Sequence, residues 1–156
     1  MKIAVFSDSH GKLEHMIAAI AAYGPDCIIH LGDKVDDADF IAAQFPHKAF
    51  LNVAGNCDYA PTVDDSKLVE LEGVRVFMAH GHRHGVKLGL EAFANSVYCS
   101  GAKLGLFGHT HRSLHHDIGG ITLLNPGSCG SGGRPTYGQI EIKNGEAHCK
   151  IVEIEE

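Results

Sequence analysis

The 156-residue sequence has no tryptophan and only five cysteines, none of them in a CxxC pair. Their wide spacing provides neither a disulfide framework nor a thiolate zinc knuckle, so we expect reduced and mostly buried thiols. The sequence also lacks an apolar run of the roughly 20 residues that a membrane-spanning helix needs. Residues 1–7 are not followed by the apolar region and cleavage site of a secretory leader. These absences predict a cytoplasmic protein with no membrane partner.

Basic residues are few as well. The chain has 13 Lys and Arg against 19 Asp and Glu, which gives a formal net charge of −6. Binding of a long nucleic-acid backbone needs clustered Lys and Arg that replace its counterions. The charge therefore disfavours a long nucleic acid as a partner and favours a small substrate. With 44% hydrophobic residues, a chain of this length can bury a core without disulfides, and we expect one domain over residues 1–156.

The first third of the chain alternates short apolar runs with helix-type spacing. Buried strands are predicted at residues 3–6, 27–31 and 49–53, and each run stops at polar residues and glycine. Helices are predicted between them, from Leu13 to the Gly24-Pro25 pair and over residues 36–45. This alternation is typical of βαβ units, in which the loops at the carboxyl ends of the strands form the functional site.

The pattern changes after residue 65. Two strands at residues 67–71 and 74–79 flank Glu72-Gly73, which predicts a hairpin turn. A helix is predicted over residues 86–97 and another short buried strand over 104–107. Alternating apolar residues in the remainder predict antiparallel strands that pack back onto the domain. The fold class expected from the elements alone is α/β.

Metal-ligand side chains gather where five of these strands end. They are Asp8, His10, Asp33, Asn56, His80, His109 and His111. Residues i and i+2 of an extended segment point the same way, so the two closely spaced pairs can each present two ligands to one site. A glycine beside nearly every ligand permits tight turns and close backbone approach. Imidazole nitrogen mixed with carboxylate and amide oxygen suits manganese, iron, zinc or nickel better than calcium or magnesium alone. The pattern predicts a catalytic metal site.

These residues form the series DxH, GD, GNCD, HGH and GHTH, which in this order resembles the calcineurin-like metallophosphoesterase family. The resemblance covers nearly the whole chain, and the small size and the GNCD form resemble the minimal bacterial and archaeal phosphodiesterases of that family. It implies a two-layer mixed β sandwich flanked by helices, an αββα arrangement. It also implies a metal-dependent phosphoesterase, and we expect a phosphodiesterase acting on a small phosphoester.

The resemblance further implies two divalent metal ions. Three residues are assigned to one ion: Asp8, His10 and His111. Three are assigned to the other: Asn56, His80 and His109. Asp33 would bridge them, because its two oxygens can bind two cations about 3.5–4 Å apart. A shared water would lose its proton near neutral pH and attack phosphorus. We expect Mn²⁺, with Ni²⁺, Co²⁺, Fe²⁺ or Zn²⁺ as alternatives, and expect Asn56 to serve in catalysis as well.

One position departs from the family pattern. Where much of the family has a histidine after the motif asparagine, this sequence has Cys57. A neutral thiol, with a reference pKa of about 8.5, is a weak proton donor and a poor partner for a dianion. The departure therefore favours diesters over phosphomonoesters. His82, two residues beyond His80, is the candidate for the missing catalytic acid.

Other interpretations stay open beside this one. The chain could be a phosphomonoesterase, or a catalytically weak, metal-binding interaction scaffold of the same fold that resembles the retromer subunit. A nuclease of the same superfamily is disfavoured by the negative charge and by the missing histidine. A homo-oligomer is left open. The remaining histidines considered are expected to be solvent-facing or locally hydrogen-bonded: His30, His47, His115, His116 and His148.

Overall fold

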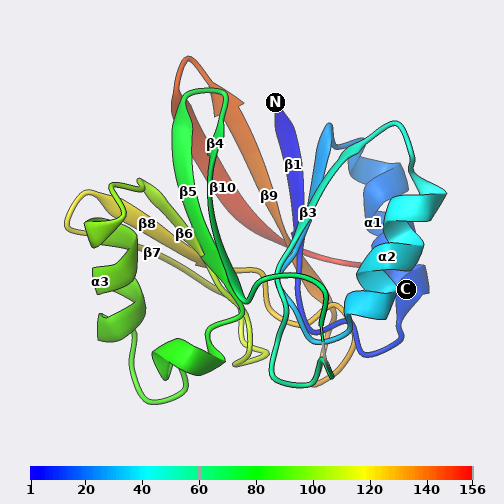
Figure 1. Ribbon diagram of the computed structural model, residues 1–156. Helices are drawn as coiled ribbons and strands as arrows, with labels where there is room; N and C mark the ends of the chain where they lie inside the picture. Colours follow the sequence, from blue (N-terminus) through cyan, green and yellow to red (C-terminus); the bar gives the residue numbers. More distant parts are fainter. Residues whose placement is uncertain (60, 156) are drawn as a thin grey trace.

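Two five-stranded mixed sheets pack face to face in the computed structural model, with helices on their outer sides (Figure 1). The structure describes residues 1–59 and 61–155, so positions 60 and 156 of the domain predicted over 1–156 lie outside the described residues. In spatial order the first sheet contains β10 (Glu146–Glu153), β9 (Thr136–Lys143), β1 (Lys2–Phe6), β2 (Cys27–His30) and β3 (Ala49–Asn52). The second contains β4 (Ser66–Leu71), β5 (Val74–Ala79), β6 (Leu104–Leu106), β8 (Ile121–Asn125) and β7 (Leu114–Ile118).

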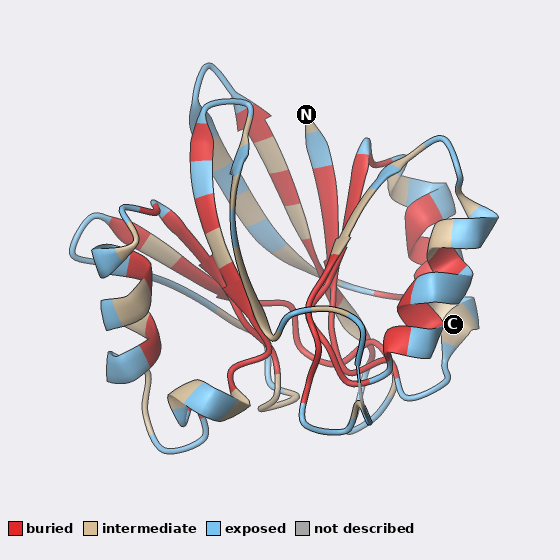
Figure 2. Ribbon diagram, in the orientation of Figure 1, coloured by how far each residue is buried: buried red, intermediate tan, exposed pale blue. Residues whose placement is uncertain are grey.

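Helices cover the outer face of each sheet. Helices α1 (Leu13–Tyr23) and α2 (Val35–Gln44) pack on the first sheet, and α3 (Glu91–Cys99) packs on the second. Figure 2 shows the buried residues along the strands and on the sides of the helices that face them. The αββα sandwich expected from the resemblance is confirmed. Within the described residues no helix is long and apolar enough to cross a bilayer.

Strand β1 explains why the central strands are apolar throughout. Ile3 and Val5 pack between the two sheets, whereas Ala4 and Phe6 pack against the layer of α1 and α2. Because both faces are covered, the strand shows no polar alternation. It lies between β2, to which it is parallel, and β9, to which it is antiparallel. The parallel strands β1, β2 and β3 therefore end at one edge of the first sheet.

Three hairpins use paired residues with positive φ, and one of them is the β7–β8 hairpin, where Gly119 and Gly120 have φ of 58° and 82°. Glu72 and Gly73, between β4 and β5, have φ of 47° and 82°, so the predicted turn is confirmed. Asn144 and Gly145, between β9 and β10, have φ of 53° and 74°. An Asn-Gly pair is a strong sequence signal for such a turn. The β9–β10 hairpin was not among the expected turns.

The helix predicted over residues 86–97 is shorter at its start than expected. Residues His82–His84 form a 3₁₀ turn, Gly85 adopts a left-handed conformation with φ of 61°, and α3 begins only at Glu91. Residues 85–88 form a turn instead, in which Leu88 N–H donates to the carbonyl of Gly85 at 2.9 Å. The expected antiparallel C-terminal strands are correct for β7, β9 and β10, but β8 also runs parallel to β6. Its burial on both faces suits that parallel pairing.

The cysteines are free, as expected, but they are not mostly buried. Cys27 and Cys129 are buried and Cys149 is half-buried. Cys57 and Cys99 are exposed, so the burial expected for the thiols is wrong at these two positions. Cys57 follows the end of β3 in a loop, and Cys99 is the last residue of α3. Neither place is covered by the opposite layer of the sandwich.

A buried polar network supports the first loops. The backbone N–H of Gly32 donates to Nδ1 of His30 at 3.2 Å, which leaves Nε2 protonated to donate to Ser9 Oγ at 2.9 Å. Ser9 Oγ donates in turn to Asp37 Oδ2 at 2.8 Å, and Gly11 N–H donates to the same oxygen at 2.7 Å. His30 is therefore neutral, buried and locally bonded. Its ring links β2 to the loop after β1 and to α2.

We expect His30 to make folding less favourable in mild acid. Burial lowers the pKa of His30 from 6.5 to about 4, so between these values the unfolded chain binds a proton that the folded chain does not. The stability that the neutral ring contributes is present above pH 6.5 and is lost as the pH falls toward 4. In urea unfolding of chelator-treated protein, lowering the pH from about 7.5 to about 5.5 should cost about 1.4 kcal/mol through this residue.

The His30→Gln variant should show a flatter pH dependence than wild type, because the titrating ring is gone. His116→Gln removes an exposed imidazole on β7 and is the matched control. An unchanged pH dependence in His30→Gln would contradict burial of a neutral ring.

Candidate metal centre

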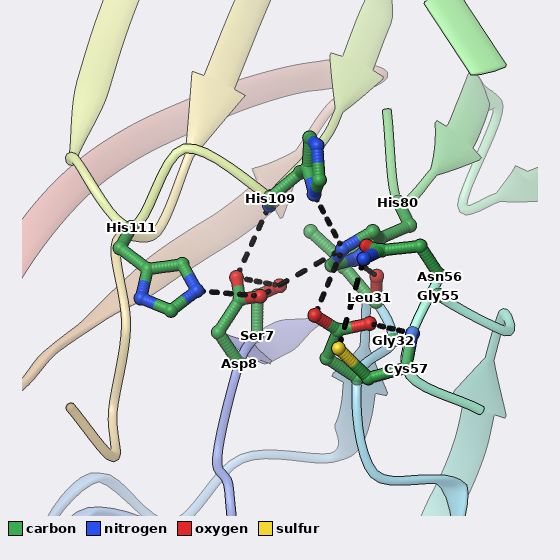
Figure 3. A network of polar contacts seen from close by, with 12 residues as sticks. Ser7, Asp8, Leu31, Gly32, Gly55, Asn56, Cys57, His80, His109 and His111 are labelled. Carbon is green, nitrogen blue, oxygen red and sulfur yellow. Dashed lines mark hydrogen bonds and ion pairs between the residues drawn. The ribbon is translucent and has the colours of Figure 1, made fainter. Parts of the chain in front are cut away.

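Two clusters of ligand-type side chains meet where the strands of both sheets end (Figure 3). The first cluster contains Asp8, His10, Asp33 and His111. The second cluster contains Asp33, His80 and His109. In each cluster one potential ligand atom per residue lies within 4.8 Å of the others. The fold thus brings six of the seven predicted ligand residues together, and Asp33 is common to both clusters.

Asp8 has one oxygen fixed by the protein and one left over. Its Oδ2 accepts hydrogen bonds from Ser7 Oγ at 2.7 Å and from His109 N–H at 3.1 Å. Its Oδ1 is buried and has no hydrogen-bond partner among the described residues. The Nε2 atoms of His111 and His80 lie 3.3 and 3.7 Å from that Oδ1. A buried carboxylate oxygen without a partner is costly, and a cation ligated by it would remove that cost.

Asp33 has a similar division between its oxygens. Cys57 N–H donates to Oδ1 at 2.9 Å, while Oδ2 lies 3.4 Å from His80 Nε2 and 4.0 Å from His10 Nε2. Burial opposes the charge, but His80 and the Cys57 N–H hold the pKa of the Asp33 carboxyl below its ordinary value. The side chain is therefore a carboxylate at neutral pH, and the oxygen directed at both clusters is Oδ2.

His80 is oriented by a backbone carbonyl. Its Nδ1–H donates to Leu31 O at 2.7 Å, which directs Nε2 into the site. Burial opposes protonation, yet Asp33 and Asp8 raise the pKa of His80. His109 Nδ1 lies 3.2 Å from His80 Nε2, and burial together with the charge of His80 lowers the pKa of His109. Two imidazole nitrogens thus point at one space beside Asp33, an arrangement that suits a shared cation.

The backbone of the ligand residues is left-handed. Positive φ values occur at five of the seven predicted ligands, between 45° and 69°: Asp8, His10, Asp33, His109 and His111. The left-handed conformation costs an ordinary residue about 1–2 kcal/mol. The expected reason for convergence, side-chain alternation along an extended segment, is therefore wrong, although the residues do converge. Sharp turns at the ligands themselves direct them inward.

Two glycines let the loops approach closely. A Cβ at Gly55 would meet the Asp33 carboxylate and backbone, and a Cβ at Gly108 would meet Ser7 Oγ and Asp8 Oδ2. Neither glycine has a positive φ, so space is what these positions require. Both glycines therefore let the backbone of one loop lie against the side chains of a neighbouring loop.

Asp58 is a supporting residue that the sequence analysis missed. Its Oδ1 accepts from Lys34 N–H and Val35 N–H, both at 2.8 Å. Its Oδ2 accepts from Gly55 N–H at 2.8 Å and from Asp33 N–H at 3.1 Å. The carboxylate therefore caps α2 and fixes the backbone of Asp33. A signal was present, because Lys34 at the start of that helix has no side-chain acceptor and another residue must supply one.

The remaining predicted residues border the two clusters. Asn56 is exposed, its amide donates to Cys57 Sγ at 3.6 Å, and Figure 3 shows that amide turned toward the side of His80. Partial burial and then the Asp33 charge raise the pKa of the Cys57 thiol, so it is neutral. The ring of His82 is centred 5.5 Å from that of His80 and 6.1 Å from that of His109. Partial burial and the charge of His80 lower the pKa of His82.

Comparison with known proteins places this geometry in a family. Residues 1–145 match the calcineurin-like phosphoesterase superfamily domain. A probable metallophosphoesterase of Mycoplasma pneumoniae is 29% identical over 151 residues, covering 92% of this chain and 91% of that protein. The probable metallophosphoesterase YsnB of Bacillus subtilis is 32% identical, with 82% and 75% covered. Phosphodiesterase MJ0936 of Methanocaldococcus jannaschii is 27% identical, with 94% and 96% covered.

Solved structures agree with this match at the level of the fold. A predicted phosphoesterase from Streptococcus pneumoniae superposes with a TM-score of 0.82 at 24% identity, covering 97% of this chain and 88% of that one. A single mutant of Vps29 from Entamoeba histolytica superposes with a TM-score of 0.78 at 18% identity, covering 99% and 100%. The described sandwich is the metallophosphoesterase-like fold, and the chain belongs to the calcineurin-like phosphoesterase superfamily.

Proposed function

We propose that this protein is a phosphodiesterase that hydrolyses a small phosphoester with the help of two divalent cations. The observation that carries the proposal is that Asp33 belongs to both ligand clusters. Its Oδ2 lies 4.0 Å from His10 Nε2 and 3.4 Å from His80 Nε2, so this carboxylate would be shared by cations held in the two clusters. The name of the archaeal relative, a phosphodiesterase that matches over most of both chains, supports the same activity.

In this proposal Asp8, His10 and His111 complete one cation site. His80, His109 and the Asn56 amide complete the other. Two cations bound there would supply Lewis acidity and make a water acidic enough to act as a nucleophile near neutral pH. The protein's own part is to hold the ligand atoms in place. Ser7 and His109 N–H fix Asp8, Cys57 N–H fixes Asp33, and the Leu31 carbonyl fixes His80.

The donor set favours a transition metal. Four imidazoles in the two clusters, with two carboxylates, suit Mn²⁺, Fe²⁺, Co²⁺, Ni²⁺ or Zn²⁺ better than Ca²⁺. We propose Mn²⁺ first. Metal binding requires neutral imidazole, so a cation at His80 would replace the proton that Asp33 and Asp8 favour there.

An interaction scaffold is the alternative from another functional class. Its support is the likeness to Vps29, which at 18% identity concerns the fold alone. A scaffold that binds no metal gives no reason for a buried Asp8 oxygen that lacks a partner among the described residues, or for left-handed backbone at five ligand positions. Cation binding accounts for both, and the names of the sequence relatives favour hydrolysis, which is the function we propose.

Chelation should abolish hydrolysis of bis(p-nitrophenyl) phosphate, and added Mn²⁺ should restore it, because the proposed ligands leave activation of the water to the cations. The measurement is release of p-nitrophenol before chelation, after dialysis and after reconstitution, with metal content followed by mass spectrometry. Undiminished turnover in protein free of transition metals would overturn the proposed mechanism.

Substrate preference should depend on Cys57. A neutral thiol gives little stabilisation to a dianion, so wild type should hydrolyse bis(p-nitrophenyl) phosphate with a higher kcat/KM than p-nitrophenyl phosphate. Cys57→His should narrow that difference. General acid catalysis contributes about 10²–10⁴-fold in favourable geometry. We expect a gain in monoester hydrolysis of about tenfold, because Asp58 is occupied by four backbone N–H groups and is not available to orient the new ring.

Cys57→Ser is the matched control for this gain, since it changes the side chain without adding a cation. A wild-type enzyme that already prefers the monoester would refute the role given to Cys57 and the choice of a diesterase.

His82 is proposed as the proton donor to the departing alcohol. Partial burial and the charge of His80 lower the pKa of His82. The proton donor is the protonated ring, and the fraction of protonated ring grows as the pH falls. His82→Gln should therefore slow hydrolysis of ethyl phenyl phosphate, which has a poor leaving group, more than that of ethyl p-nitrophenyl phosphate. The difference should increase in mild acid. His115→Gln, at an exposed position on β7, is the control, and equal losses for both esters would leave His82 without this role.

A further inference from the structure

A cavity of about 640 Å³ lies beside the metal centre, at the end of the second sheet. One wall comes from the segment between the 3₁₀ turn and α3, and another from the loop between β6 and β7. Leu114 of β7 and Asn125 of β8 complete its lining. Its volume is in the range of pockets that hold small molecules. We refer to it below as the side cavity.

The side cavity and the metal centre share one loop. His109 and His111 belong to the two ligand clusters, while the alternate residues Thr110 and Arg112 line the side cavity. The same four residues therefore form the partition between the two spaces. A substrate held at the clusters would therefore have the side cavity on the other side of this loop.

Hydrogen bonds from Asn125 of β8 hold the loop between the two spaces in place. The buried amide of Asn125 donates to Thr110 Oγ1 at 3.0 Å and to Gly108 O at 3.1 Å. Thr110 Oγ1 in turn accepts from Arg112 N–H at 3.1 Å. The loop is thus tied to β8, and the cavity wall is preorganised for a ligand.

The lining of the side cavity combines apolar surface with positive charge. Val86, Leu90, Phe107 and Leu114 provide the apolar part, and Lys87 and Arg112 are exposed cations at its edge. The cavity lining contains no acidic residue, although the whole chain has a formal charge of −6. Neither Lys87 nor Arg112 forms an ion pair with an acidic side chain within residues 1–59 and 61–155.

Arg112 follows His111 directly in the chain, so one cation of the cavity lining lies next to a ligand residue of the first cluster. A ligand spanning both spaces would meet ligand residues at one end and a cation beside apolar side chains at the other.

We infer that the side cavity binds one ester group of the substrate, and that this group is an apolar or aromatic body carrying a second negative charge. The inference rests on the proposed function and specifies its substrate class. The apolar body would lie against Leu90 and Leu114, and its anion would pair with Lys87 and Arg112. A diester with two small uncharged ester groups would use only the metal centre.

Three diesters that share a p-nitrophenyl group test this inference: the ethyl, phenyl and 4-carboxyphenyl p-nitrophenyl phosphates. With Mn²⁺-loaded wild type, kcat/KM for total loss of diester should rise in that order. From the phenyl to the 4-carboxyphenyl diester, kcat/KM should increase about tenfold, as expected for a charge-assisted contact. Lys87→Gln and Arg112→Gln should each reduce the ratio of kcat/KM between the 4-carboxyphenyl and phenyl diesters. Leu90→Ser should reduce the ratio between the phenyl and ethyl diesters.

Matched controls are Lys143→Gln for Lys87 and Arg75→Gln for Arg112. Lys143 ends β9 beside the β9–β10 hairpin, and Arg75 lies on β5 with its side chain at the carbonyl of Ser100. Neither residue lines the side cavity. Both variants should therefore show the wild-type order of kcat/KM for the three diesters, with the same ratios between them. A change in the controls equal to that in the cavity variants would contradict the assignment.

Binding provides a readout that does not depend on turnover. Calorimetry with 4-phosphonobenzoate and phenylphosphonate should show tighter binding of the carboxylated compound, and Arg112→Gln should remove that difference. Equal kcat/KM for all three diesters, or equal affinity for the two phosphonates, would overturn the side-cavity inference while leaving the diesterase in place. Absence of hydrolysis of every diester by metal-loaded protein would instead overturn the proposed function, and a retained preference for 4-phosphonobenzoate would then assign the cavity to anion binding alone.

Discussion

Two carboxylates placed in one buried site impose the constraint on which the rest of the structure depends. Ligand atoms of Asp8 and Asp33 lie within 4.8 Å of each other in the first cluster, and both residues are buried. Like charges at that distance in a poorly solvated place repel each other and raise the cost of ionisation. The protein offsets this with directed donors, and one oxygen of each carboxylate accepts hydrogen bonds from neighbouring groups. The other oxygen of each faces imidazoles, where cations would offset the remaining charge.

Holding these carboxylates in place determines much of the surrounding architecture. Asp8 follows β1 and Asp33 follows β2, while His80 and His109 come from the second sheet, so the site exists only where the two layers meet. The bond from His80 Nδ1 to the Leu31 carbonyl joins the layers directly. Two further carboxylates support the ligand residues without belonging to the clusters. Asp58 accepts from Asp33 N–H, and Asp37 accepts from Gly11 N–H in the loop after β1. The left-handed ligand residues are sustained by this surrounding network.

Much of the sandwich could be predicted from the sequence, because its strands and helices have simple periodicities. The central apolar runs became β1, β2, β3 and β6, and the Glu72-Gly73 turn joins β4 and β5 as expected. The αββα layering came from the motif resemblance. The start of α3 could not be read from spacing, since residues 86–90 have apolar positions that suit a helix but are not helical in the structure, where α3 begins at Glu91.

The sequence indicated which residues lie together at the candidate site, but not the backbone conformation that brings them together. Polar residues at the ends of buried strands indicated six residues that the fold brings together. Five of the six have left-handed backbone, which Asp and His adopt more often than most residues but still only in a small fraction of cases, so the extended alternation assumed for them was wrong. The role of Asp58 depends on contacts with residues more than 20 positions away, and the side cavity depends on two segments that only folding brings together.

The central claim is that one carboxylate is shared by two cations, and counting the ions tests it most directly. Chelated wild type and Asp33→Asn would be titrated with Mn²⁺ by calorimetry, and bound ions would be counted by native mass spectrometry. Wild type should bind two ions per chain, and Asp33→Asn should bind fewer or bind both much more weakly, because an amide removes the negative charge between them. Saturation of wild type with a single ion, or two ions bound to Asp33→Asn with unchanged affinity, would contradict the account.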